Sequence, residues 1–393
     1  MKSPFKGAII AAAFLLNGAS AFALDAIVEK KTFEMPSYTT VGGKVIKQVR
    51  IGYETYGKLN AAGDNAILVP HFFSANSHVA GKYKADDKLP GYWDAIVGPG
   101  KPLDTDKYFI IGVDSLSNIN TKDGITVTTG PASINPDTGK PYALTFPVVR
   151  IRDFVNTQKA LMDALGVKKL HAVMGASMGA QQSYEWAAAY PDMVQRLIPV
   201  IGSAHSDGWV IAMMQTWADP VRLDPNWKQG NYYGGPEPVD GLTLAFKMVN
   251  RDARQPAWAD GTFGRKIGAA GDPAQDINAR YALEEWQDAA SRARASSADA
   301  NNFLYLTRAV QLHALDGAAT VAEGLKKVKA KTLMLPDHRD MLLLTEYARV
   351  ERDILKAQGV LSGYRELQGT LGHLDGVVAI AQASEEIAKF LGE

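Results

Sequence analysis

Residues 171–184, HAVMGASMGAQQSY, have the pattern of a buried strand, a very tight turn and the start of a helix. The turn is Gly175-Ala176-Ser177-Met178-Gly179, and we expect glycine at both of its ends because strand and helix backbones approach there too closely for a Cβ atom. Ser177 stands at the strained apex, at the positive end of the following helix. This arrangement is typical of a serine that acts as the nucleophile in acyl transfer.

Apolar runs on both sides of this turn predict further strands, and segments with helical spacing lie between them. The alternation predicts a mostly parallel sheet with helices on both faces, which is the α/β-hydrolase fold when a serine elbow lies at its centre. The predicted strands are 27–28, 45–53, 66–70, 108–113, 194–201, 330–335 and 364–367, and the predicted helices of the core are 149–166, 343–358 and 377–391.

Residues 206–326 differ from the rest of the chain. They hold most of the tryptophans and several helix-like stretches, 239–253, 277–296 and 301–316. We interpret them as a helical cap inserted over the site. The predicted organisation is therefore a signal peptide at 1–23, a first core part at 24–205, the cap at 206–326 and a last core part at 327–393.

The N-terminus has the layout of a secretory signal peptide. Lys2 and Lys6 form the positive start, residues 7–16 form an apolar run too short to cross a bilayer, and Ala21-Phe22-Ala23 gives a cleavage site. The sequence therefore predicts a periplasmic or secreted protein without a membrane anchor.

Composition excludes several classes of function. Lys+Arg and Asp+Glu are both 42, so the chain has no basic excess for binding nucleic acid. It has no cysteine, which excludes disulfides, thiolate metal sites and cysteine nucleophiles. No metal-binding or phosphate-binding motif is present, so we predict neither a metal nor a cofactor, and the expected partner is a small acyl ester.

A serine nucleophile needs a base, and an acid that orients the base. His373 in Gly372-His373-Leu374 follows the last predicted strand, where the fold places the base. Asp337 and Asp340 both follow the strand 330–335, and position alone leaves either as the acid. The oxyanion hole needs two backbone N–H groups, predicted at Met178 and around Phe72-Phe73.

Several long motifs resemble the homoserine O-acetyltransferase group of the α/β-hydrolase superfamily. The resemblance runs from Tyr53 to the C-terminus and implies Ser177, Asp340 and His373 as the triad. It also implies Phe73 and Met178 as oxyanion donors, and a cap that often forms dimers. The motifs are YETYGKLN (53–60), the stretch 71–81, YWDAIVGPGKPLDTDKYFIIG (92–112), TGPASINPDTGKPY (129–142), FPVVRIRD (146–153), GASMGAQQSYEWAAAYPD (175–192), DPNWKQGNYY (224–233) and GH (372–373).

Two positions depart from that family. In the family, an arginine that binds the homoserine carboxylate occupies the position of Ala218 in this chain. An aspartate follows the catalytic histidine in the family, whereas Leu374 follows it here. Arg222, one helical turn away, is the candidate substitute for the arginine. From these departures and the signal peptide we predict a secreted serine ester hydrolase that forms an acyl-enzyme. The alternative is a homoserine O-acetyltransferase or a related acyltransferase that uses acetyl-CoA.

Overall fold

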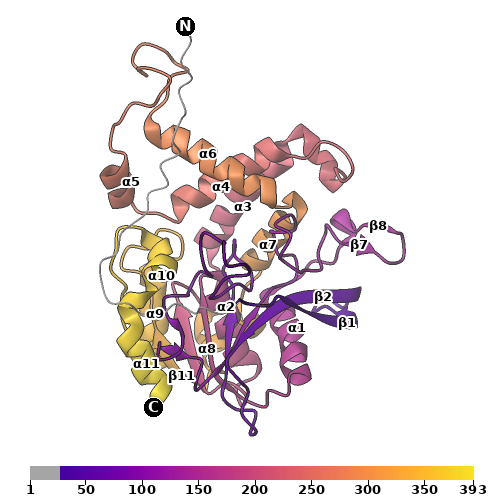
Figure 1. The fold of residues 1–393 in the computed structure, drawn as a ribbon, viewed down its shortest axis with the longest axis vertical. Coiled ribbons are helices and arrows are strands. Elements are labelled where there is room, and N and C mark those ends of the chain that lie inside the picture. Colours follow the sequence, from indigo (N-terminus) through magenta and orange to yellow (C-terminus); the bar gives the residue numbers. More distant parts are fainter. Residues whose placement is uncertain (1–26) are drawn as a thin grey trace.

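The computed structural model describes residues 27–393 (Figure 1), and the predicted signal peptide at 1–23 lies outside them. An eight-stranded sheet forms the centre, in the order β1-β2-β6-β3-β9-β10-β11-β12. The strands are β1 Lys31–Thr39, β2 Val45–Tyr56, β3 Ala66–Pro70, β6 Phe109–Val113, β9 Leu170–Ala176, β10 Arg196–Val200, β11 Lys331–Met334 and β12 Leu361–Tyr364. β2 runs antiparallel to both of its neighbours, and all other pairs are parallel. The predicted fold class is confirmed.

Helices cover both faces of the sheet, as the strand sequences require. In β3, Leu68 packs into one apolar cluster, whereas Ile67 and Val69 pack into the cluster on the opposite face. The first cluster includes residues of α1 (Ile151–Ala164), α2 (Met178–Ala189) and α9 (Thr345–Ala357), and the second includes α11 (Ser384–Gly392). A strand buried on both faces must be apolar throughout, which explains the continuous run AILVP.

The chain between β10 and β11 is mainly helical. In Figure 1 α3, α4 and α6 lie above the sheet, with α4 packed against both α3 and α6. The helices of this part are α3 Gly208–Leu223, α4 Val239–Asp252, α5 Pro256–Thr262, α6 Ala282–Ser297, α7 Ala300–Gln311 and α8 Val321–Leu325, with 3-10 turns η2 Pro225–Gly230 and η3 Leu315–Gly317. The boundaries predicted for the cap, 206 and 326, stay predictions.

Three predicted elements differ from the structure. The first strand is β1 and not 27–28, because β1 is exposed on alternate residues and lacks an apolar run. β12 lies three residues before the predicted strand, since it is a half-buried edge strand with a weak pattern. The last helix is broken into α10 Asp375–Val378, η5 Ile380–Ala383 and α11. The remaining short elements are β4 Val97–Gly98, β5 Leu103–Asp104, β7 Ile134–Asn135, β8 Lys140–Pro141, η1 Ala143–Thr145 and η4 Gly372–Leu374.

No helix within residues 27–393 combines the length and the apolar character needed to cross a bilayer.

A buried carboxyl group joins α9 to the elbow helix. Glu351 accepts hydrogen bonds from the Tyr184 hydroxyl (2.9 Å) and from the Ala204 amide (2.7 Å). Burial raises the pKa of Glu351 to about 7, and these two hydrogen bonds oppose the shift. A raised pKa means that the folded protein favours the protonated carboxyl. The resulting stabilisation is complete at pH values below the pKa of the unfolded chain, and it is lost as the pH rises through the pKa of the folded protein.

We therefore expect wild type to lose stability between about pH 4.5 and 7 relative to Glu351→Gln, by about 3 kcal/mol at most. Denaturant unfolding at several pH values measures this difference. Glu346→Gln is the matched control, because Glu346 is exposed on the same helix. Parallel stability curves for wild type and Glu351→Gln across this range would contradict the expectation.

Candidate active site

Ser177 lies at the junction of β9 and α2, in the strained turn that the sequence predicts. Its backbone has φ 57° and ψ −121°, and residues other than glycine rarely adopt a positive φ. A Cβ atom on Gly175 would lie 2.4 Å from the Gly179 carbonyl oxygen, and one on Gly179 would lie 2.3 Å from that of Pro70. The two glycines thus allow the strand and the helix to approach as closely as the turn demands.

The structure brings Ser177, His373 and Asp340 together from three distant parts of the chain. Ser177 Oγ lies 2.7 Å from His373 Nε2, and His373 Nδ1 lies 2.6 Å from Asp340 Oδ2. All three residues are buried. This is the geometry in which the imidazole accepts a proton from the hydroxyl while the carboxylate fixes its tautomer.

The two candidate acids occupy different environments. Asp340 Oδ1 accepts hydrogen bonds from the amides of Leu342 and Leu343, which leaves Oδ2 for His373. Asp337 instead accepts from the Arg339 amide and lies 3.5 Å from His338. Burial, with the nearby Asp375 charge, raises the pKa of Asp337 to about 6. The geometry therefore favours Asp340 as the partner of the imidazole.

Both predicted oxyanion donors line the cavity at Ser177. Within residues 27–393, the amide N–H groups of Phe73 and Met178 donate no hydrogen bond to another protein group. Met178 is the first residue of α2, where an amide has no partner inside the helix. Two such amides beside the hydroxyl match what a tetrahedral oxyanion needs.

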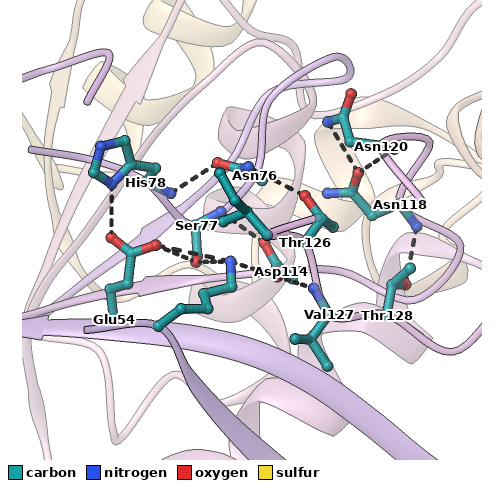
Figure 2. Close-up of polar contacts among 12 residues, drawn as sticks. Glu54, Asn76, Ser77, His78, Asp114, Asn118, Asn120, Thr126, Val127 and Thr128 are labelled. Carbon is teal, nitrogen blue, oxygen red and sulfur yellow. Dashed lines mark hydrogen bonds and ion pairs between the residues drawn. The ribbon is translucent and has the colours of Figure 1, made fainter. Parts of the chain in front are cut away.

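Side-chain amides behind the cavity hold the loop that carries Phe73. Asn118 Nδ2 and Asn120 Nδ2 donate to the Ala75 carbonyl at 2.9 and 3.1 Å, and Figure 2 shows the two asparagines side by side. His71 is fully buried, and burial lowers its pKa to about 4. Its Nε2 accepts from the Ser115 amide, so the neutral ring carries its proton on Nδ1 and donates to the Phe72 carbonyl. His71 is therefore a structural support of the loop.

Two buried carboxylates lie deeper under the same loop (Figure 2). Asp114 accepts from the Ser77 amide, and Glu54 accepts from the Ser77 hydroxyl and from His78. Lys30 lies 2.8 Å from Asp114 and 3.7 Å from Glu54. Burial raises the pKa of Asp114 despite this cation. Burial also tends to raise the pKa of Glu54. The hydrogen bond with His78 and the charge of Lys30 outweigh this effect and bring the pKa of Glu54 below its ordinary value.

We expect Lys30→Met to lower the free energy of unfolding by about 3–5 kcal/mol, because it leaves both carboxylates buried without their ammonium partner. The loss should be smaller at low pH, where the carboxyl groups are protonated. Denaturant unfolding measures it. Lys31→Met is the matched control, since Lys31 only donates a hydrogen bond to Thr55. Equal effects of the two substitutions would contradict this account of the network.

A cavity of about 200 Å³ opens on Ser177 and His373. It is smaller than the roughly 300–1,000 Å³ of sites for drug-sized ligands, so it suits a small substrate. Its polar side chains other than the triad are Ser74, Gln181, Asn250, Arg254 and Arg294. The remaining lining residues are apolar: Phe72, Phe73, Met178, Ile201, Met214, Trp217, Phe246, Val249, Ala253, Val310, Leu342, Leu343, Leu374 and Val377.

The predicted substitute cation does not lie in this cavity. Arg222 is not among the lining residues, and it forms an ion pair with Asp219 at 3.2 Å. Ala218 is a buried residue of α3, and Leu374 presents an apolar surface to the cavity. Arg254 and Arg294 were not predicted from the sequence, because no motif marks them. They lie far from Ser177 in the sequence, and only the packing of α4 and α6 brings them to the site.

Comparisons with known proteins agree with this architecture. Residues 90–350 match the alpha/beta hydrolase fold family. The homoserine O-acetyltransferase of Symbiobacterium thermophilum is 38% identical over 355 residues, which cover 89% of this chain and 91% of that protein. The crystal structure of homoserine O-acetyltransferase from Bacillus anthracis is 37% identical, with a TM-score of 0.89 over 94% of this chain and 98% of the other. A crystal structure of esterase E22 is 45% identical, with a TM-score of 0.89 over 93% and 100%.

The homoserine O-acetyltransferases among these relatives correct the main prediction of activity, an ester hydrolase. Curated relatives between 36% and 39% identical are homoserine O-acetyltransferases, and they favour the alternative stated from the sequence. The prediction gave too much weight to the missing arginine at position 218. A cation is not absent from the site, because Arg254 in the turn after α4 and Arg294 on α6 line the same cavity.

Proposed function

The chain belongs to the homoserine O-acetyltransferase family of α/β-hydrolase-fold enzymes, and from this premise we propose that it is an acyltransferase. It moves an acetyl group from acetyl-CoA to the hydroxyl of homoserine or of a related small alcohol. The observation that carries the proposal is the continuous hydrogen-bonded chain from Ser177 Oγ through His373 to Asp340. In this proposal Ser177 is the nucleophile, His373 the base and Asp340 the residue that orients it.

The first half-reaction acylates the enzyme. His373 Nε2 accepts the Ser177 proton while Oγ attacks the thioester carbonyl carbon. The amides of Phe73 and Met178 donate hydrogen bonds to the oxygen as it becomes negative. When the tetrahedral intermediate collapses, the carbon–sulfur bond breaks and His373 returns its proton to the leaving thiolate. Free coenzyme A and acetyl-Ser177 result.

The second half-reaction transfers the acetyl group. The acceptor hydroxyl gives its proton to His373 Nε2 and attacks the acetyl-Ser177 carbonyl, again with the oxyanion on the same two amides. Collapse breaks the bond to Ser177 Oγ, which regains the proton, and the new ester leaves. The mainly apolar walls of the cavity favour a bound alcohol over water at this step, because they offer water few hydrogen-bond partners.

Thiol release from acetyl-CoA, measured with and without each of several small alcohols, tests the proposal. We expect an acceptor to raise the rate of release and an acetyl ester of that acceptor to form in equal amount. Release that is independent of every alcohol, with acetate as the only product, would refute it.

Export and dimer formation stay predictions from the sequence. Export through the segment 1–23 is expected to leave a mature N-terminus at Leu24, which the intact mass of protein from the native cells measures. Pairing of two chains through the cap is tested by the mass of the purified protein in solution.

A further inference from the structure

The cavity at Ser177 contains two guanidinium groups and no carboxylate from its walls. Besides the catalytic His373, the basic residues that line it within the described part of the chain are Arg254 and Arg294, and no aspartate or glutamate lines it. Neither arginine forms an ion pair with a carboxylate of residues 27–393. Both side chains are half-buried, and of the two only Arg294 feels a named carboxylate charge, that of Asp123. An anionic ligand offsets the cost of removing such a cation from water.

Arg294 is the better placed of the two. Its Nη2 donates to the Ser74 carbonyl at 2.5 Å and to Asn120 Oδ1 at 3.1 Å. These bonds hold the guanidinium beside Ser74, the residue after the oxyanion donor Phe73. Nε and Nη1 have no protein partner in residues 27–393, which leaves two nitrogens with three N–H bonds for a ligand. Burial lowers the pKa of Arg294, but a guanidinium remains charged at neutral pH.

Arg254 is held differently. Its guanidinium carbon lies 4.5 Å from the ring centre of Trp258 and 5.0 Å from that of Trp286, and its Nη1 donates to the Asn250 carbonyl. Its Nε is buried and has no hydrogen-bond partner. Arg294 has one more distant ring contact, 5.7 Å from the ring centre of Phe246. Because two indole rings flank Arg254 more closely, we assign the ligand contact to Arg294.

The same walls offer no anion to a positively charged substrate group. Leu374 lines the cavity with an apolar side chain. Outside the triad, the side-chain acceptors that line it are neutral: the Ser74 hydroxyl and the amides of Gln181 and Asn250. Gln181 Oε1 is buried without a partner, so it suits a neutral donor such as a hydroxyl. A neutral oxygen offsets less of the desolvation of an ammonium than a carboxylate does.

We propose that the acyl acceptor is a small hydroxy acid without an ammonium group, whose carboxylate binds Arg294. This inference rests on the proposed acyltransferase function and narrows its substrate class. The carboxylate sits beside the oxyanion loop, and the small cavity keeps the hydroxyl of a short chain near acetyl-Ser177. An amino acid of the same length loses the solvation of its ammonium on entry and finds no counter-charge.

Three acceptors of equal chain length test the proposal: 4-hydroxybutyrate, homoserine and butane-1,4-diol. Homoserine adds only an ammonium to 4-hydroxybutyrate, and the diol lacks the carboxylate. With acetyl-CoA as donor, we expect kcat/KM for 4-hydroxybutyrate to exceed that of either other acceptor by about tenfold or more. Homoserine used as well as 4-hydroxybutyrate, or better, overturns the inference and leaves the acyltransferase function intact. No transfer to any alcohol overturns both.

Arg294→Met tests the contact itself. We expect kcat/KM for 4-hydroxybutyrate to fall by about tenfold to a hundredfold, mainly through KM, with a much smaller loss for butane-1,4-diol. Arg294→Lys should recover part of the loss because it keeps the charge. Arg222→Met is the matched control, an arginine of the cap outside the cavity. An equal loss for the acid and the diol would mean that Arg294 only positions the Ser74 loop, and it would overturn the inference.

Discussion

Ser177→Ala should lower acetyl transfer by about a millionfold, because the acyl-enzyme no longer forms. The folded structure should survive, since alanine keeps the Cβ atom that already tolerates φ 57° at this position. Release of coenzyme A in the presence of acceptor measures the loss. Labelling of wild type by a fluorophosphonate, and its absence in the variant, measures the nucleophile directly.

Ser183→Ala is the matched control for that substitution. Ser183 is a buried serine of the same helix, and its hydroxyl donates to the Gly179 carbonyl and does not line the cavity. It should keep most of the activity and all of the labelling. Substantial transfer by Ser177→Ala would mean that another group performs the chemistry.

Asp340→Asn should lower the rate of transfer by about ten-thousandfold. The backbone amides of Leu342 and Leu343 hold the Oδ1 position, so an amide nitrogen replaces the carboxylate oxygen that lies 2.6 Å from His373 Nδ1. Facing an N–H donor, the imidazole takes the wrong tautomer and loses the lone pair on Nε2 that serves as base. Steady-state rates with acetyl-CoA and the best acceptor measure the effect.

Asp337→Asn distinguishes the two aspartates of this loop. Asp337 accepts from the Arg339 amide and makes no hydrogen bond with His373, so the variant should lose less than about tenfold in rate. If Asp337→Asn were instead the more damaging change, the assignment of the acid to Asp340 would be wrong.

The elbow was predictable because its cause is local. The glycines at 175 and 179, the apolar run before them and the helical pattern after them lie within twenty residues of Ser177. Their close contacts in the structure are those expected of a strand and a helix joined by so short a turn. The buried strands β3 and β6 were predictable for a related reason, since burial on both faces demands an uninterrupted apolar run.

The walls of the site were not predictable, because they depend on packing between distant segments. Arg294 has nothing in its sequence context to distinguish it from Arg292, which lies exposed on the same helix and pairs with Asp240. Asp337 and Asp340 follow the same strand, and only the direction of each side chain separates them. Lys30 and Asp114 form an ion pair although they lie more than eighty positions apart in the sequence, and no motif marks either residue.

Edge elements were misplaced for a different reason. β1 and β12 lie at the two ends of the sheet, where one side of the strand meets solvent and the apolar pattern is weak. Strand ends there are set by pairing with a neighbour and not by the strand's own composition.

Trapping the acyl-enzyme shows directly whether the acetyl group passes through Ser177. Wild-type protein is mixed with acetyl-CoA and no acceptor, quenched in acid after a short interval, and digested for mass spectrometry. We expect one acetyl group on the peptide that carries Ser177 and no such group in Ser177→Ala. When an acceptor is added before the quench, the acetyl group should leave Ser177 as an acetyl ester. Acetylation elsewhere, or transfer to the acceptor with Ser177 never acetylated, would contradict this mechanism.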